Sequence, residues 1–221
     1  MTIVEPKKKD IIHPGSKKKH SAALRLWHWA NMIVISGSLL TVLLNSTVLS
    51  GGNDAPVIKQ ALQKAGAIVT DKQVTSATHD LSDKVWDIHV YFGYGLVALL
   101  LFRLILEFFQ LADQKFIRIL KTAWRKFTQA KKPGATARHE VAVKSIYAVF
   151  YLLLITMAVT GLFLAFEDFF APYKSIRHSV KEVHNFCMYP ILAFIGIHLI
   201  GVFLAERKDS KGIVSDMING G

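Results

Sequence analysis

The sequence predicts an all-α integral membrane protein built as a bundle of four transmembrane helices. Of its 221 residues, 52% are hydrophobic, and the mean hydropathy of +0.33 is too high for a soluble domain of this size. Four apolar segments are each long enough to cross a bilayer, which takes about 20 helical residues. They comprise residues 27–49, 85–109, 143–166 and 183–205, all within one predicted domain over 21–210.

The distribution of charge predicts how this bundle is oriented. The formal net charge is +11, and the basic residues crowd the tail 1–20, the segment 115–144 and the C-terminal end, including the short tail 211–221. With four spans these regions lie on one side, which the positive-inside rule assigns to the cytoplasm. We therefore expect a multi-pass protein of the bacterial inner membrane with both termini cytoplasmic. Its positive charge then serves topology and contact with anionic lipid, and nucleic-acid binding is not expected.

The elements follow in order along the chain. The first span opens with Trp27 and Trp29, whose rings suit the membrane interface. The outer connection 50–84 includes one short predicted helix, near Val57–Ala65. Residues 115–129 place aromatic and aliphatic side chains on one face and basic ones on the other, which predicts an amphipathic helix in the cytoplasmic interface.

The fourth span carries two histidines, His184 and His198, fourteen residues apart. Ionisable side chains are rare in membrane spans because burying them in hydrocarbon is costly. Fourteen helical residues return to within roughly 40° of the starting face and advance about 21 Å. The two imidazoles therefore share a face at two depths.

Two further histidines, His28 and His89, lie near the first turns of the first and second spans. The first span runs outward, so His28 is expected near the cytoplasmic surface, at the depth of His198. The second and fourth spans both enter from outside, so His89 is expected at the depth of His184. The other five histidines lie in the tail, in loops or beside spans, and we expect them at the surface.

Four histidines at two matched depths predict two stacked haems of the b type, an inner one held by His28 and His198 and an outer one held by His89 and His184. Two neutral imidazoles saturate the iron and leave no position for oxygen or substrate, so such centres transfer electrons. The single cysteine, Cys187, excludes an intrachain disulfide and a cysteine-ligated iron–sulfur cluster. Any iron–sulfur chemistry must then belong to a partner.

Charged and polar residues beside the spans are candidates for cofactor contacts. Arg25 and Arg103 are expected near the inner haem, where they would pair with propionates, although snorkelling to the lipid interface is the alternative. Lys84, Arg177 and Lys181 are the outer-side equivalents. A quinone headgroup needs hydrogen-bond partners and a proton path, for which Asn31, Glu107 and Glu206 are candidates. The alternative for the last three is helix capping or pairing with a lysine.

Several short motifs resemble the di-haem cytochrome b subunit of nickel–iron hydrogenases and its wider superfamily. They are Arg25-Leu26-Trp27-His28-Trp29, Ile88-His89 followed by Gly93-Tyr94, Val183-His184 and Ile197-His198. The closing stretch from Leu204 to Gly220 resembles the end of the hydrogenase subunit. The resemblance covers the chain from about Arg25 to Gly220.

This resemblance implies four transmembrane helices, two b haems and membrane quinone as the redox partner. In the hydrogenase branch, an iron–sulfur small subunit docks on the periplasmic side, and electrons pass through the outer and inner haems to quinone. One position departs from the pattern: many hydrogenase cytochromes have a second histidine after the first ligand of the fourth span, where this chain has Asn185.

The sequence thus predicts an electron-transfer subunit of a quinone-linked oxidoreductase rather than a complete enzyme. Its expected partners are periplasmic iron–sulfur and catalytic subunits, hydrogenase first, and a homodimer within a larger complex is compatible with it. One alternative is the same cytochrome serving another oxidoreductase or acting alone. A second is a haem-free membrane anchor whose histidines bind metal or relay protons.

Overall fold

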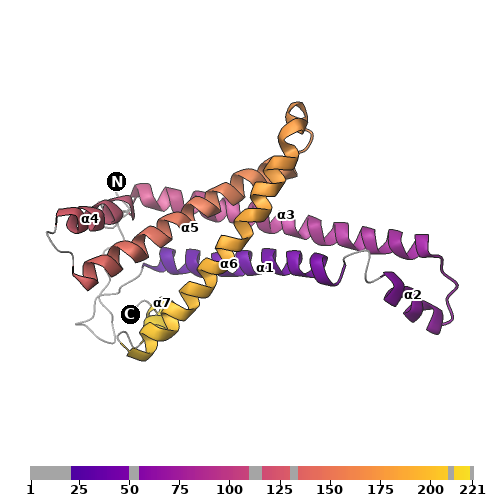
Figure 1. The fold of residues 1–221 in the computed structure, drawn as a ribbon, viewed down its shortest axis with the longest axis horizontal. Helices are drawn as coiled ribbons and strands as arrows, with labels where there is room; N and C mark the ends of the chain where they lie inside the picture. The colour runs from indigo at the N-terminus through magenta and orange to yellow at the C-terminus, as the bar shows by residue number, and fades with distance from the viewer. Residues whose placement is uncertain (1–20, 50–54, 110–115, 130–133, 209–211, 220–221) are drawn as a thin grey trace. The chain divides into compact units, whose positions relative to one another are not determined.

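The structure, a computed structural model, describes residues 21–49, 55–109, 116–129, 134–208 and 212–219. The basic tail predicted over 1–20 lies outside the described residues. The regular elements of the described chain are helices (Figure 1), in the order α1 (Ala22–Thr47), α2 (Ala55–Lys64), α3 (Asp71–Phe109), α4 (Phe116–Gln129), α5 (Ala135–Ala165), the 3-10 helix η1 (Ala171–Ile176), α6 (Arg177–Lys208) and α7 (Ile213–Asn219).

Four helical stretches have the length and apolarity of membrane spans, as the sequence predicted. They are Ala22–Thr47, Asp71–Glu107, Ala135–Ala165 and Ala171–Arg207. Only 6–17% of the residues in their most apolar windows are buried inside the protein. Apolar side chains that point outward from long helices are the pattern expected when lipid, rather than protein, covers them.

The chain divides into two compact units. One unit holds Met1–Trp29 and Ala98–Gly221, and the other holds Ala30–Val97. In the first unit, α5 packs against α4 and α6, and α6 packs against η1 and α7 (Figure 1). Its core contains Leu154 and Ala158 of α5 together with Cys187 and Ile191 of α6.

The amphipathic helix predicted over 115–129 is present as α4, Phe116–Gln129. Helix α4 packs against α5. Ala123 of α4 and Val141 of α5 are both buried. Ile117 and Trp124 stay exposed on α4. Large exposed apolar side chains on a basic amphipathic helix are typical of a helix that lies at a membrane surface.

In the second unit, α1 and α3 approach closely at a glycine. A Cβ atom added to Gly37 would lie 2.3 Å from Cζ of Phe92. The Phe92 ring therefore occupies the space that any larger residue at position 37 would fill. Near the C-terminal end of α1, Ser82 Oγ of α3 donates a hydrogen bond to Asn45 Oδ1 at 3.2 Å. Small residues and side-chain hydrogen bonds are the usual means by which membrane helices associate.

Helix α3 begins at Asp71, well before the span predicted to start at residue 85, so much of the predicted outer connection is helical. At 39 residues it is about 58 Å long, so it extends beyond a hydrocarbon core of about 30 Å. Apolarity locates the membrane-spanning part of such a helix but not its polar continuation. The short helix predicted near 57–65 is present as α2, which ends at Lys64.

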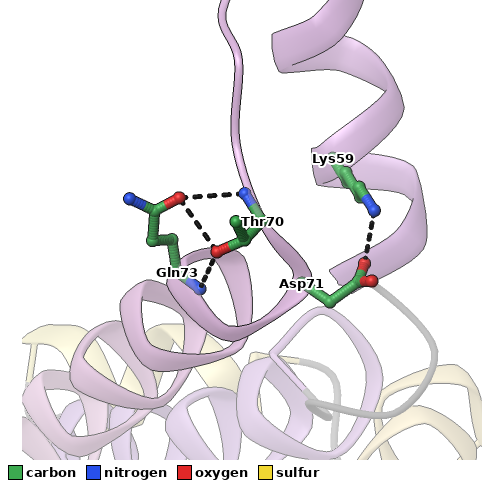
Figure 2. Close-up of polar contacts among 4 residues, drawn as sticks. All are labelled: Lys59, Thr70, Asp71 and Gln73. Atoms are coloured by element: carbon green, nitrogen blue, oxygen red, sulfur yellow. Dashed lines mark hydrogen bonds and ion pairs between the residues drawn. The ribbon is translucent and has the colours of Figure 1, made fainter.

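A capping box fixes where α3 starts (Figure 2). The backbone N–H of Gln73 donates to Thr70 Oγ1 at 3.3 Å, and the backbone N–H of Thr70 donates to Gln73 Oε1 at 2.9 Å. Such a reciprocal pair satisfies two backbone amides that have no partner within the helix. Lys59 of α2 forms an ion pair with Asp71 at 2.7 Å, which links α2 to the first turn of α3.

Candidate functional site

Two of the four predicted ligands, His28 and His198, lie side by side in the first unit. Their ring centroids are 6.3 Å apart and the ring planes are inclined by 59°. His28 is in the second turn of α1, and His198 lies in the last third of α6. The two positions are 170 residues apart in sequence, so the fold rather than local structure brings them together.

This separation fits two imidazoles that share one metal ion. Imidazole nitrogens bind metals at about 2 Å, so two rings on opposite sides of one ion would have centroids about 6 Å apart. The observed 6.3 Å leaves room for iron and does not require the rings to move apart. The arrangement can therefore hold a haem iron between His28 and His198.

Aromatic side chains surround His198. The Phe194 ring lies parallel to the imidazole, with centroids 5.9 Å apart and planes inclined by 4°. Phe194 stacks in turn on Phe150 of α5 at 4.0 Å. The hydroxyl of Tyr147 lies 3.5 Å from His198 Nδ1, at the long limit of a hydrogen bond. Helix α5 thus supports the His198 ring through Tyr147, which contacts it directly, and through Phe150, which stacks on Phe194.

His184 of α6 contacts the last third of α5. Its Nδ1 lies 2.8 Å from the hydroxyl of Thr160, a buried residue. A Cβ atom added to the neighbouring Gly161 would lie 3.3 Å from Cε1 of the imidazole. The ring therefore lies close to the α5 backbone, and any side chain at position 161 larger than that of glycine would crowd it.

His89 lies in the second unit, on α3, and contacts α1. Its Nδ1 is 2.9 Å from the hydroxyl of the buried Thr41 and 3.3 Å from that of Ser38. The indole of Trp86, one turn earlier, meets the imidazole edge-on with centroids 5.4 Å apart. His89 belongs to the unit Ala30–Val97, and His184 belongs to the other unit.

Arg103, a predicted propionate partner, is buried among polar and aromatic groups of the first unit. Its Nη1 lies 3.2 Å from Oε2 of Glu107, and its Nε donates to the Tyr151 hydroxyl at 3.2 Å. The guanidinium also lies over the rings of Tyr151 and Trp27, at 5.8 and 6.0 Å from their centroids. Glu107, a predicted quinone contact, thus pairs with an arginine, whereas the pairing expected as its alternative was with a lysine.

Arg25 and Glu206, the other two candidates of this unit, both contact the C-terminal helix α7. Arg25 Nη1 donates to the carbonyl oxygen of Ile218 at 2.9 Å. Glu206 accepts from the backbone amides of Gly212 and Val214 at 2.8 and 3.3 Å. The helix-capping alternative for Glu206 therefore describes its contacts.

The third quinone candidate, Asn31, belongs to the second unit and is buried, and its Nδ2 has no hydrogen-bond partner within the described chain.

Two of the three basic residues predicted on the outer side, Arg177 and Lys84, have local partners. Arg177 Nη2 donates to the carbonyl oxygen of Leu164 at 3.1 Å and forms an ion pair with Glu167. Lys84 pairs with Asp87 at 3.2 Å on the exposed surface of α3. Arg177 thereby connects the start of α6 to the end of α5. This structural role is compatible with an anionic group nearby.

Sequence reasoning missed the side chains that contact the histidines from neighbouring helices: Thr41, Thr160 and Tyr147. Polar residues at membrane depth are a general signal of function or helix contact. That signal does not say which histidine a threonine meets, because the answer depends on how two helices are rotated about their axes.

The histidine sites do not resemble a metal centre built from protein ligands alone. Among the described residues, no group of three or more histidine, cysteine, aspartate or glutamate side chains is arranged to hold a metal ion. Paired imidazoles instead suit a metal whose other positions are occupied by a macrocycle, as in haem.

Comparison with known proteins agrees with this chemistry. Residues 19–220 match the family described as prokaryotic cytochrome b561, which is also named for the b-type cytochrome of nickel-dependent hydrogenases. No curated protein and no solved structure matches the chain. The family match includes all four apolar helices and all four predicted ligand histidines. The chain therefore belongs to the prokaryotic cytochrome b561 family, multi-pass membrane proteins that carry b-type haem and transport electrons.

Proposed function

We propose that this cytochrome carries electrons between a periplasm-facing iron–sulfur partner and membrane quinone through two bis-histidine b haems. The observation that carries the proposal is the 6.3 Å separation of the His28 and His198 rings, which suits two axial ligands of one iron. Hexacoordinate haem supplies one-electron transfer without binding oxygen or substrate. His28 and His198 would hold the inner haem.

His89 and His184 are proposed as the ligands of the outer haem. The equal membrane depth predicted for the two residues from their positions in the spans supports this assignment. A common feature of their surroundings supports it as well. Each presents Nδ1 to a buried threonine hydroxyl, at 2.9 Å for His89 and 2.8 Å for His184. Metal-ligating histidines commonly use their second ring nitrogen in this way. The proposal therefore uses all four histidines, two for each haem.

A nickel–iron hydrogenase is the proposed partner, because the matching family is named for its cytochrome. Its iron–sulfur subunit would dock on the periplasmic side and pass electrons to the outer haem. The inner haem would then reduce quinone near the cytoplasmic side. Arg25 and Arg103 are proposed to interact with inner-haem propionates, and Asn31, Glu107 and Glu206 to serve the quinone. Both termini are proposed to lie in the cytoplasm of a bacterial cell.

The first test is a reduced-minus-oxidised absorption spectrum with pyridine-haemochrome quantitation, made on the detergent-purified chain with its bound partners. We expect two low-spin b haems per chain. Iron–sulfur and hydrogenase subunits in the same preparation would support the proposed partner, and another set of redox subunits would replace it. A preparation without haem would overturn the electron-transfer proposal and leave a membrane anchor.

A set of histidine variants tests the pairing. His28→Ala and His198→Ala should each retain one haem per chain, and the double variant should also retain one, because both residues hold the same haem. His28→Ala combined with His89→Ala should lose both. His178→Ala, on the exposed surface at the start of the same helix as His198, is the matched control and should keep two. A double variant His28→Ala/His198→Ala without haem would contradict the pairing.

A further inference from the structure

We propose that Thr41 and Thr160 are positioning residues that fix the protonation of His89 and His184. In this arrangement each imidazole carries its proton on Nδ1 and presents the lone pair of Nε2 as the ligand. The inference rests on the proposed function for the role of these histidines, but its geometric basis is the hydrogen bonding of two threonines. Thr41 belongs to α1 and Thr160 to α5, so the same arrangement occurs independently on two helices.

The hydroxyl of Thr160 has only one proton to donate, and its neighbours decide where that proton goes. Its Oγ1 lies 2.6 Å from the carbonyl oxygen of Thr156 and 2.8 Å from Nδ1 of His184. A carbonyl oxygen can only accept, so the short contact to Thr156 uses the hydroxyl proton. The contact to His184 then requires Nδ1 to carry a hydrogen and to donate it to the hydroxyl oxygen.

Thr41 repeats this logic. Its Oγ1 donates to the carbonyl oxygen of Ser38 at 2.6 Å and lies 2.9 Å from Nδ1 of His89. The His89 ring must therefore donate from Nδ1. The side chain of Ser38 lies farther from the same nitrogen, at 3.3 Å, and is the secondary contact. Both threonines are buried, which limits competition from water.

A neutral imidazole with its proton on Nδ1 has its lone pair on Nε2, the nitrogen farther from the backbone. The hydrogen bond also fixes the rotation of the ring and increases its basicity as a ligand. A more basic ligand favours the oxidised iron, so each threonine should lower the reduction potential of the haem that its histidine holds. His198 differs, because the Tyr147 hydroxyl lies at the longer distance of 3.5 Å from its Nδ1.

The test compares three variants of the purified full complex. Thr160→Val removes the hydroxyl and keeps the shape of the side chain, and Thr160→Ser keeps the hydroxyl. Thr156→Val is the matched control, because it removes a hydroxyl one turn earlier on α5 that donates to a carbonyl of its own helix, that of Leu152. The readouts are the potentiometric titration of the haem bands and the rate of haem transfer to apomyoglobin.

We expect Thr160→Val to shift the potential of one haem upward and to weaken haem retention by about 10- to 100-fold, the usual range for removing a hydrogen-bond partner of a ligating histidine. Thr160→Ser should restore the wild-type potential, and Thr156→Val should match the wild type. Thr41→Val should act on the same readouts, with the full effect in the double variant Ser38→Ala/Thr41→Val.

Two results would overturn the inference. One is a haem-loaded Thr160→Val protein with the wild-type potential and transfer rate, and the other is an equal change in Thr156→Val. If Thr160→Val does not accumulate, Thr160→Ala and Thr41→Val provide the same comparison, because each also removes a hydroxyl that contacts a histidine. A wild-type protein that lacks haem would instead refute the proposed function, so the two failures are distinguishable.

Discussion

Arg25 donates a hydrogen bond from Nη1 to the carbonyl oxygen of Ile218, at 2.9 Å and across 193 residues of sequence. Trp29 donates from its indole to the neighbouring carbonyl of Met217 at 3.2 Å. These two donors lie on either side of His28 and bind carbonyls in the last turn of α7, where helices lack internal partners. At the other end of α7, Glu206 accepts from the amides of Gly212 and Val214. The C-terminal helix is thus attached to the turn of α1 that carries His28.

Loss of the Glu206 carboxylate should release α7. In Glu206→Ala both amide contacts disappear, whereas Glu206→Gln keeps one accepting oxygen, so protease cleavage near residue 212 should be fastest in the alanine variant and intermediate in the glutamine variant. Glu182→Ala, an exposed change on α6, is the control and should leave the rate unchanged. Mass spectrometry of the C-terminal fragments measures the rate. Equal cleavage in Glu206→Ala and Glu182→Ala would show that α7 is held in another way.

Replacement of Gly37 should destabilise the second unit. A Cβ atom there would lie 2.3 Å from the Phe92 ring, so Gly37→Ala must displace a ring, at a cost of about 1–3 kcal/mol for overpacking. Gly93→Ala is the matched control, because a Cβ atom at Gly93 meets nothing within 4 Å and alanine is the better helix former. Thermal unfolding in detergent should rank Gly37→Ala below the wild type and Gly93→Ala at or above it. Phe92→Leu should partly rescue Gly37→Ala if the ring is the cause.

The apolar segments of the sequence predicted the four long helices because a bilayer imposes both length and composition on each span. They did not predict where the helices end. Helix α3 continues through the polar residues that follow Thr70, and its start depends on a capping box whose members, Thr70 and Gln73, are visible in the sequence but carry no apolar signal. Helix α7 was predicted only as part of a tail, because its seven residues are held by distant side chains.

The site shows the same division. Spacing along the spans and the inferred topology predicted that His28 and His198 would share a depth, and in the structure their rings are 6.3 Å apart. The hydroxyl partners of the histidines were not predicted. Thr160 and His184 lie on different helices, and their contact depends on helix rotation, which a single sequence does not specify. The pairing of His89 with His184 stays a prediction.

Removal of the capping box should fray the start of α3. Thr70→Ala loses the hydroxyl that accepts from the backbone N–H of Gln73. Losing such an N-terminal cap lowers the stability of a helix by about 1 kcal/mol. Thr75→Ala, an exposed change inside the same helix, is the control and should be neutral or slightly stabilising because alanine favours helices. Hydrogen exchange of amides in the first turn of α3 measures the effect. Lys59→Ala should matter less, because exposed ion pairs contribute little.

The pairing of Arg103 with Glu107 makes a prediction that separates stability from electron transfer. Both side chains are largely buried, at 10% and 19% exposed, so Glu107→Ala leaves an arginine without its carboxylate inside a membrane protein. Removing one partner of a buried pair costs about 3 kcal/mol or more. We therefore expect a lower unfolding temperature for Glu107→Ala, followed through the Soret band. Glu107→Gln retains a hydrogen-bond acceptor and should lose less.

The same two variants test the proposed quinone role of Glu107. If this carboxylate delivers protons, Glu107→Gln should slow quinone reduction while the haem content and potentials stay at wild-type values, because glutamine can accept from Arg103 but cannot give up a proton. Glu140→Gln is the control, since Glu140 pairs with Lys144 four residues later on α5. Stopped-flow oxidation of the reduced haems by a water-soluble quinone gives the rate. A wild-type rate in Glu107→Gln, together with a destabilised Glu107→Ala, would leave Glu107 with a structural role as the partner of Arg103.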